Sequence, residues 1–209
     1  GRSRRARLAA GAASAGLLAA VPLLSACGGA PHPGAAAVVD GRRITVSQLQ
    51  AQVRDVRDAQ RESPQAEQLI AASGRLGQNT LMRMIRARVI ERAAKDAGVG
   101  VSRRDVQQAR GTDERQAGGG AALAALYLDQ GVAPGQIDGV VRTELLRERL
   151  LDKLGTDGAK RQFDRTFKAL DIEVNPRYGR WDPERGTTVL ADDPWLRPAA
   201  DADRVNPGA

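Results

Sequence analysis

Residues 36–45 read AAVVDGRRIT, and they are expected to open the folded part of the chain. The apolar run at 36–39 predicts a small strand, because four consecutive apolar residues are followed at once by a turn signal. Asp40-Gly41 supplies that turn, since both residue types tolerate a positive φ. Arg43-Ile44 then continues the chain, so the stretch predicts a strand and turn that can close as a hairpin.

From this stretch to residue 170, the chain has the periodicity of amphipathic helices. Thr45 or Ser47 caps the first helix, and Thr45 with Gln48 three residues later forms a capping-box pattern. Glycines and prolines divide the rest of this region into separate helices. The first helix runs to about residue 61, and the others cover 65–72, 79 or 80 to 97, 102–110, 121–130, 135–154 and 160–170, with a glycine-rich loop at 111–120.

Residues 171–175, DIEVN, change the period, because apolar and polar residues alternate there as in a half-buried strand. Such a strand needs a partner, and the only good candidate is the run at 36–39. The sequence therefore predicts a mostly α, multi-helix domain with a small β pairing. That pairing joins the opening strand, about 36–39, to the closing strand, about 171–175.

The sequence Leu24-Ser25-Ala26-Cys27 has the form of a bacterial lipobox. An arginine-rich start and the Ala/Leu/Gly-rich stretch 8–23 precede it, and small residues stand before the cysteine, as secretory cleavage sites require. Cys27 is the only cysteine in the chain. The pattern predicts lipidation at Cys27, with Leu24, Ser25 and Ala26 recognised by the signal peptidase.

Other interpretations of this start remain open. The stretch 8–23 is shorter and less apolar than the ~20 residues of a membrane-spanning helix, which disfavours a retained anchor. An ordinary signal-peptide cleavage site with a stray thiol at Cys27 is the alternative. Arg4-Arg5 resembles part of a twin-arginine signal, but the general secretory route is preferred. Because the sequence begins at Gly1 rather than Met, we expect further residues upstream.

These features divide the chain into four segments. Residues 1–26 form the lipoprotein signal peptide, and residues 27–35 form a flexible tether, because small residues and prolines bury little apolar surface. Residues 36–178 form the helical domain. Residues 179–209, rich in Pro, Asp, Gly and Arg, are expected to be a disordered tail.

The net charge becomes smaller once the signal peptide is removed. The chain has 32 basic and 25 acidic residues, and residues 1–26 contain four of the arginines and no acid. The mature part then has a net charge of +3, with basic and acidic residues interleaved on the expected helices. This pattern favours solvated surfaces over a nucleic-acid interface. With Cys27 lipidated, no thiol is left for a disulfide.

The inventory of reactive residues disfavours an enzyme. His32, the only histidine, lies in the tether, so Cys/His nucleophile pairs and metal-ligand clusters cannot be built in the helical domain. Gly118-Gly119-Gly120 lacks the Lys-Ser/Thr and the strand context of a phosphate-binding loop. The acidic pair Asp192-Asp193 lies in the tail. We therefore predict no catalytic residue, no metal ligand and no cofactor.

Three segments resemble SurA/PrsA-type chaperones. Residues 37–45, AVVDGRRIT, and 99–106, VGVSRRDV, are similar to the N-terminal domain of that family, and 175–182, NPRYGRWD, resembles the ending of actinobacterial SurA N-terminal-like lipoproteins. In that family, a strand near the end of the domain pairs with the opening one. Many members also carry a parvulin prolyl-isomerase domain, but no segment here fits it, so no catalytic residue is carried over.

The resemblance implies a membrane-anchored, extracytoplasmic chaperone-like or peptide-binding lipoprotein that assists the folding of secreted or envelope proteins without catalysis. Its protein partners would be unfolded or nascent secreted proteins, or an envelope protein. Lipid on Cys27 would attach it to the membrane. The alternative is an envelope assembly or scaffolding lipoprotein that binds one specific protein partner. Met82 and Met84 beside Ile85 offer adaptable apolar contacts for a groove, but residues at this spacing more often belong to the core.

Overall fold

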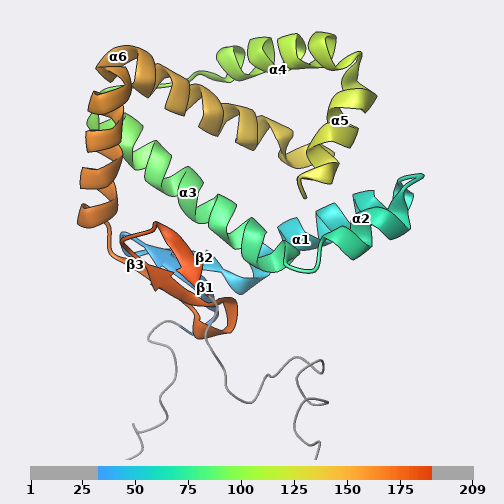
Figure 1. Cartoon of the computed structure of the whole chain (residues 1–209), viewed down its shortest axis with the longest axis horizontal. Coiled ribbons are helices and arrows are strands. Elements are labelled where there is room, and N and C mark those ends of the chain that lie inside the picture. The colour runs from blue at the N-terminus through green and yellow to red at the C-terminus, as the bar shows by residue number, and fades with distance from the viewer. Residues whose placement is uncertain (1–32, 190–209) are drawn as a thin grey trace, which may run out of the picture. The chain divides into compact units, whose positions relative to one another are not determined.

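The computed structural model describes residues 33–189 and has a mostly α fold, as predicted (Figure 1). The lipobox residues Leu24, Ser25, Ala26 and Cys27 lie outside the described residues. The helices are α1 (Val46–Glu62), α2 (Ala66–Ala72), α3 (Leu76–Asp96), α4 (Arg103–Ala117), α5 (Gly120–Asp129) and α6 (Ile137–Ala169). The strands are β1 (Ala35–Val39), β2 (Arg42–Thr45), β3 (Ile172–Val174), β4 (Arg180–Asp182) and β5 (Thr187–Val189).

The predicted pairing of the opening and closing strands is confirmed. The three-stranded sheet has the order β2-β1-β3, and Val39 lies opposite Ile172 in an antiparallel pair. The β1–β2 hairpin turns at Asp40 and Gly41, whose φ angles are 53° and 71°. Strand β1 is the central strand, and all five of its residues are buried.

The sheet leads directly into α1, as the capping-box pattern predicted. Of the two candidate caps, Thr45 is the one that ends the strand and begins the helix. Its Oγ1 accepts a hydrogen bond from the Gln48 N–H at 3.1 Å, and the Gln48 side chain accepts one from the Thr45 N–H at 3.0 Å. Both groups would otherwise lack a partner at the start of the helix.

Two large apolar clusters and a smaller third one, which packs α1 and α2 against α5, form the core. The sheet cluster joins β1, β2, α1 and α3 to the end of α6, and the helical cluster joins the end of α3 to α4, α5 and the first half of α6. Met82 is only 9% exposed and Met84 is half-buried, and both belong to the sheet cluster. These methionines are therefore core residues.

Helix α6 contributes side chains to both large clusters because it bends. Gly155 has φ 66° and ψ 170°, a combination that only glycine adopts readily, and this residue separates two helical segments. The interruption at Gly155 was predicted from the sequence. Figure 1 shows the first segment crossing above α3 and the second descending towards the sheet.

Three predictions about helix boundaries are wrong. The last helix, predicted over 160–170, begins directly after Gly155 as the second segment of α6. Helix α4 continues to Ala117 through most of the expected loop at 111–120, because Arg110 pairs with Glu114 one turn later at 3.0 Å across Gly111. One glycine lowers helix stability by about 1 kcal/mol, and a pair of this kind offsets about 0.2–0.5 kcal/mol of that loss. The packing of α4 against α5 and α6 supplies the remainder. Helix α3 likewise begins at Leu76 rather than at residue 79 or 80.

The expectation of a disordered tail from residue 179 is wrong for residues 180–189, which are ordered. Residues 180–189 form the β4–β5 hairpin, and the remainder lies outside the described residues. Trp181 stacks on Phe167 of α6 with ring centroids 6.3 Å apart, and it packs against the sheet cluster. This contact joins segments that no local sequence pattern relates. None of the helices among residues 33–189 is both long and apolar enough to cross a membrane.

Candidate functional site: a cationic cleft

A cleft of about 790 Å³ opens where the β1–β2 turn, α3, the α3–α4 connection and α6 meet. We call it the cationic cleft, because basic side chains outnumber acidic ones around it. Its volume lies in the range of roughly 300–1,000 Å³ that is usual for ligand sites. The lining residues are Val39, Asp40, Arg42, Arg88, Glu91, Arg92, Lys95, Gly98, Val99, Gly100, Arg142, Leu146 and Leu170.

The floor of the cationic cleft is apolar and lies where the two large core clusters meet. Val39 and Leu170 belong to the sheet cluster and are 2% and 8% exposed. Leu146 belongs to the helical cluster, and Val99 packs against that cluster. Because these side chains are held by the core, the floor is formed before any ligand arrives.

Arg88 forms part of the wall and joins α3 to β2. Its two terminal nitrogens donate to the carbonyl oxygens of Arg42 and Arg43 at 2.9 and 3.1 Å. Burial lowers the pKa of the Arg88 guanidinium, the charge of Arg42 lowers this pKa further, and Glu91 opposes both effects. The group still carries its charge at neutral pH, and its hydrogen-bond partners are uncharged carbonyls.

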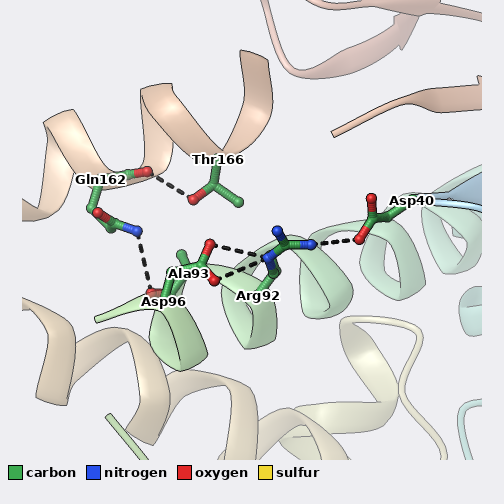
Figure 2. A network of polar contacts seen from close by, with 6 residues as sticks. All are labelled: Asp40, Arg92, Ala93, Asp96, Gln162 and Thr166. Atoms are coloured by element: carbon green, nitrogen blue, oxygen red, sulfur yellow. Dashed lines mark hydrogen bonds and ion pairs between the residues drawn. The ribbon is translucent and has the colours of Figure 1, made fainter. Parts of the chain in front are cut away.

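Arg92, one turn further along α3, is neutralised by two carboxylates (Figure 2). Its Nε lies 3.0 Å from Asp96 Oδ1, and its Nη1 lies 2.5 Å from Oδ2 of Asp40 in the hairpin turn. The hydrogen bond with Asp96 is the main reason that the pKa of Arg92 is raised. Asp40 also donates its N–H to the carbonyl oxygen of Asp171, so this network fixes the hairpin turn on two sides.

Figure 2 also shows how the second segment of α6 is attached beside this network. Gln162 donates through Nε2 to the Ala93 carbonyl at 3.5 Å, and its own carbonyl accepts from the Thr166 hydroxyl at 2.9 Å. Both contacts lie close to the Arg92 ion pairs. The edge of the cationic cleft formed by α3 is therefore braced from α6 as well as from the hairpin.

The opposite wall is the α3–α4 connection, which three cations of α6 hold in place. Arg142, Arg149 and Lys153 donate to the carbonyl oxygens of Val101, Gly100 and Ala97 at 2.6, 2.6 and 2.7 Å. At spacings of seven and four residues, the three side chains share one face of α6. The connection that lines the cleft thus has a defined shape.

Asp105 anchors the end of this connection. Its carboxylate accepts from the N–H of Ser102 at 2.8 Å and from the Ser102 hydroxyl at 2.8 Å, and Arg149 lies 3.1 Å away. These hydrogen bonds, the one from the Ser102 backbone first, lower the pKa of Asp105 to about 2. The predicted start of α4, residue 102, is the N-cap of that helix.

This shift predicts a pH dependence of stability for Asp105. Because the pKa falls from 3.8 to about 2 on folding, the carboxylate stabilises the protein above pH 3.8, and this contribution is lost as pH falls through about 2. Asp105→Asn removes that titration, so the gap between the urea midpoints of wild type and variant is expected to shrink from pH 5 to pH 2. Asp55→Asn, an exposed carboxylate on α1, is the control; an equal change there would contradict the assignment.

Two cations of the cleft have no polar partner within residues 33–189. Arg42 on β2 and Lys95 near the end of α3 are exposed, and their side chains make no hydrogen bond or ion pair there. Across the lining, five basic side chains stand against two acidic ones. The cationic cleft therefore has a positive field above an apolar floor, an arrangement that binds by charge and apolar contact.

The sequence did not predict the cationic cleft, although one signal was present. Arg88, Arg92 and Lys95 are spaced by four and three residues and so share a face of α3. Among the described residues, no three His, Cys, Asp or Glu side chains are grouped to hold a metal ion. The cleft lining itself contains no Ser, Thr, Cys or His.

These features define an α-rich binding domain in which a small sheet joins the two ends of a helical body. A family model described as the SurA-like N-terminal domain matches residues 15–151, more than half of the chain. The chain therefore belongs to the SurA-like N-terminal domain family, as its sequence motifs indicated. Membership indicates a chaperone-type or protein-binding role, and the match includes no parvulin domain. No curated protein and no solved structure matches the chain.

Proposed function

We propose that this protein is a lipid-anchored, extracytoplasmic chaperone-like protein that binds segments of secreted or envelope proteins without catalysis. Family membership supports binding of client proteins in general. The cationic cleft is the observation that carries the proposal further. Its apolar floor is already formed, and its walls are held by Arg88, Arg142, Arg149 and Lys153 through backbone carbonyls. A polypeptide segment entering the cleft would therefore meet a largely preorganised site.

Binding without chemistry follows from what the cleft presents to a client. The floor at Val99 and Leu146 removes apolar side chains of the client from water, and the cations attract its carboxylates. The residues around the cleft supply no paired nucleophile and base. Protection would then come from shielding a segment that would otherwise associate with other unfolded chains.

The direct test is suppression of aggregation. Full-length protein is added to several unrelated unfolded substrates, and light scattering is followed as they are diluted from denaturant. We expect protection of more than one substrate and loss of protection in Val99→Arg, which places a charge on the half-buried part of the cleft floor. Circular dichroism checks that this variant is folded. Protection of none would contradict the chaperone function.

A single dedicated partner is the second candidate, and the fixed walls of the cleft favour it. Ion pairs and carbonyl contacts on three sides leave less freedom than a promiscuous site usually has. Crosslinking in intact cells separates the two candidates. Many crosslinked proteins would support the chaperone, whereas one stoichiometric partner with no aggregation suppression would support a scaffold in envelope assembly.

Anchoring at Cys27 rests on the lipobox, Leu24-Ser25-Ala26-Cys27, and predicts an all-or-none change. Wild type is expected to incorporate labelled palmitate and to sediment with membranes, whereas Cys27→Ala does neither, because the acyl chains supply the affinity for the bilayer. His32→Gln, which lies outside the lipobox, is a control that keeps the cysteine. Equal labelling of Cys27→Ala and wild type would contradict the anchor.

A further inference from the structure

We propose that the cationic cleft selects acidic polypeptide segments, in which Asp or Glu residues flank an aliphatic side chain. This inference rests on the proposed function and specifies its class of client. The ligand is defined by two properties of the cleft: cations that lack a carboxylate partner, and an apolar floor between them.

The distribution of ion pairs is the first argument. The acidic residues around the cleft are already engaged, because Asp40 and Asp96 share Arg92, and Glu91 lies 3.8 Å from Arg142. Three other cations of the lining have no carboxylate within hydrogen-bond distance among residues 33–189. Arg42 and Lys95 have no polar partner within residues 33–189, and Arg88 bonds only to carbonyl oxygens there.

The position of these three cations is the second argument. Arg88 and Lys95 lie seven residues apart on α3, and therefore on one face of the helix, while Arg42 lies on the adjoining strand β2. They border one rim of a single cleft. Carboxylates of a bound segment would add partners to Arg88 without breaking its contacts to β2, since a guanidinium has five N–H donors.

The shape of the cleft favours a polypeptide over a lipid surface. Val39, Leu146 and Leu170 form a floor that is recessed behind the charged rim, and each is less than 10% exposed. A side chain projecting from an extended segment can reach such a floor, and the side chains two positions before and after it, which point to the same side, can reach the rim. A flat array of anionic headgroups would contact only the rim cations.

The test uses fluorescence anisotropy with the full chain and the labelled peptide Gly-Ser-Glu-Ser-Leu-Ser-Glu-Ser-Gly, in which each Glu stands two positions from the Leu and so points to the same side in an extended chain. Two matched peptides replace every Glu by Gln or by Lys. We expect the Glu peptide to bind about tenfold more tightly than the Gln peptide at low salt, which is what two or three partly exposed ion pairs supply. The Lys peptide should bind most weakly, and added salt should reduce the difference.

Matched variants locate the effect in the cleft. Arg42→Gln combined with Lys95→Gln is expected to reduce the preference for Glu over Gln to less than about threefold, because only Arg88 remains unmatched. Arg54→Gln combined with Arg104→Gln removes the same charge from exposed positions on α1 and α4, outside the cleft lining, and should keep the preference. Circular dichroism of both double variants confirms that they are folded.

The outcomes separate this inference from the proposed function. Equal binding of the Glu and Gln peptides, with aggregation suppression retained, would overturn the acidic preference alone. If the wild-type protein neither binds the peptides nor suppresses aggregation, the proposed function is overturned as well. Displacement of the Glu peptide by phosphatidylglycerol vesicles, but not by phosphatidylcholine vesicles, would assign the cations to an anionic membrane surface and so overturn the inference.

Discussion

A chain that ends at Ala169 is expected to lose its cooperative unfolding transition. The truncation removes β3, which covers one edge of the buried strand β1, together with Leu170 and Ile172 of the sheet cluster. Fully burying such side chains contributes about 1.5–3 kcal/mol each. The loss of both, of the β1–β3 hydrogen bonds and of the Phe167–Trp181 stack approaches the whole stability of a small domain, about 5–15 kcal/mol.

Urea unfolding followed by far-ultraviolet circular dichroism measures this effect. The control is a chain that ends at Val189, which keeps every contact that the structure describes and is expected to unfold as the full chain does. The comparison is informative because the family match ends at residue 151, before the second segment of α6 and the closing strand. A sharp transition of the Ala169 truncation at the same urea concentration would show that β3 is dispensable.

Leu150→Ala is expected to lower the free energy of unfolding by about 2–5 kcal/mol. Leu150 lies on the first segment of α6, is 0% exposed and belongs to the helical cluster beside Leu146 and Val141. The substitution removes apolar contacts and leaves a cavity that close-packed neighbours fill only in part. The helical propensity of alanine does not offset this loss, because leucine is nearly as good a helix former.

Leu126→Ala is the matched control, because it makes the same chemical change on a helix at a side chain that is 53% exposed. Its effect is expected to be within about 0.5 kcal/mol. Chemical denaturation of both variants at one pH gives the two values. Similar losses for the two would mean that Leu150 is not packed as the structure shows.

Local patterns in the sequence predicted several elements correctly. The Asp40-Gly41 turn, the Thr45–Gln48 capping box and the glycine at residue 155 each depend on the conformational preferences of one or a few neighbouring residues. The β1–β3 pairing was also predictable, since only two stretches had the pattern of a strand and each needed a partner. The errors occurred where a contact outweighed a local signal, as at Gly111 inside α4.

The sequence by itself thus determined the helical class, the hairpin turn, the pairing of the opening and closing strands and the similarity to the SurA-like family. The cationic cleft and the placement of the β4–β5 hairpin, by contrast, depend on long-range packing and could not be predicted from the sequence. Asp40 and Arg92 are 52 residues apart, and Arg88 finds its acceptors on a strand more than 40 residues earlier. Such contacts depend on how the core clusters bring α3, α6 and the sheet together, and no local propensity encodes them.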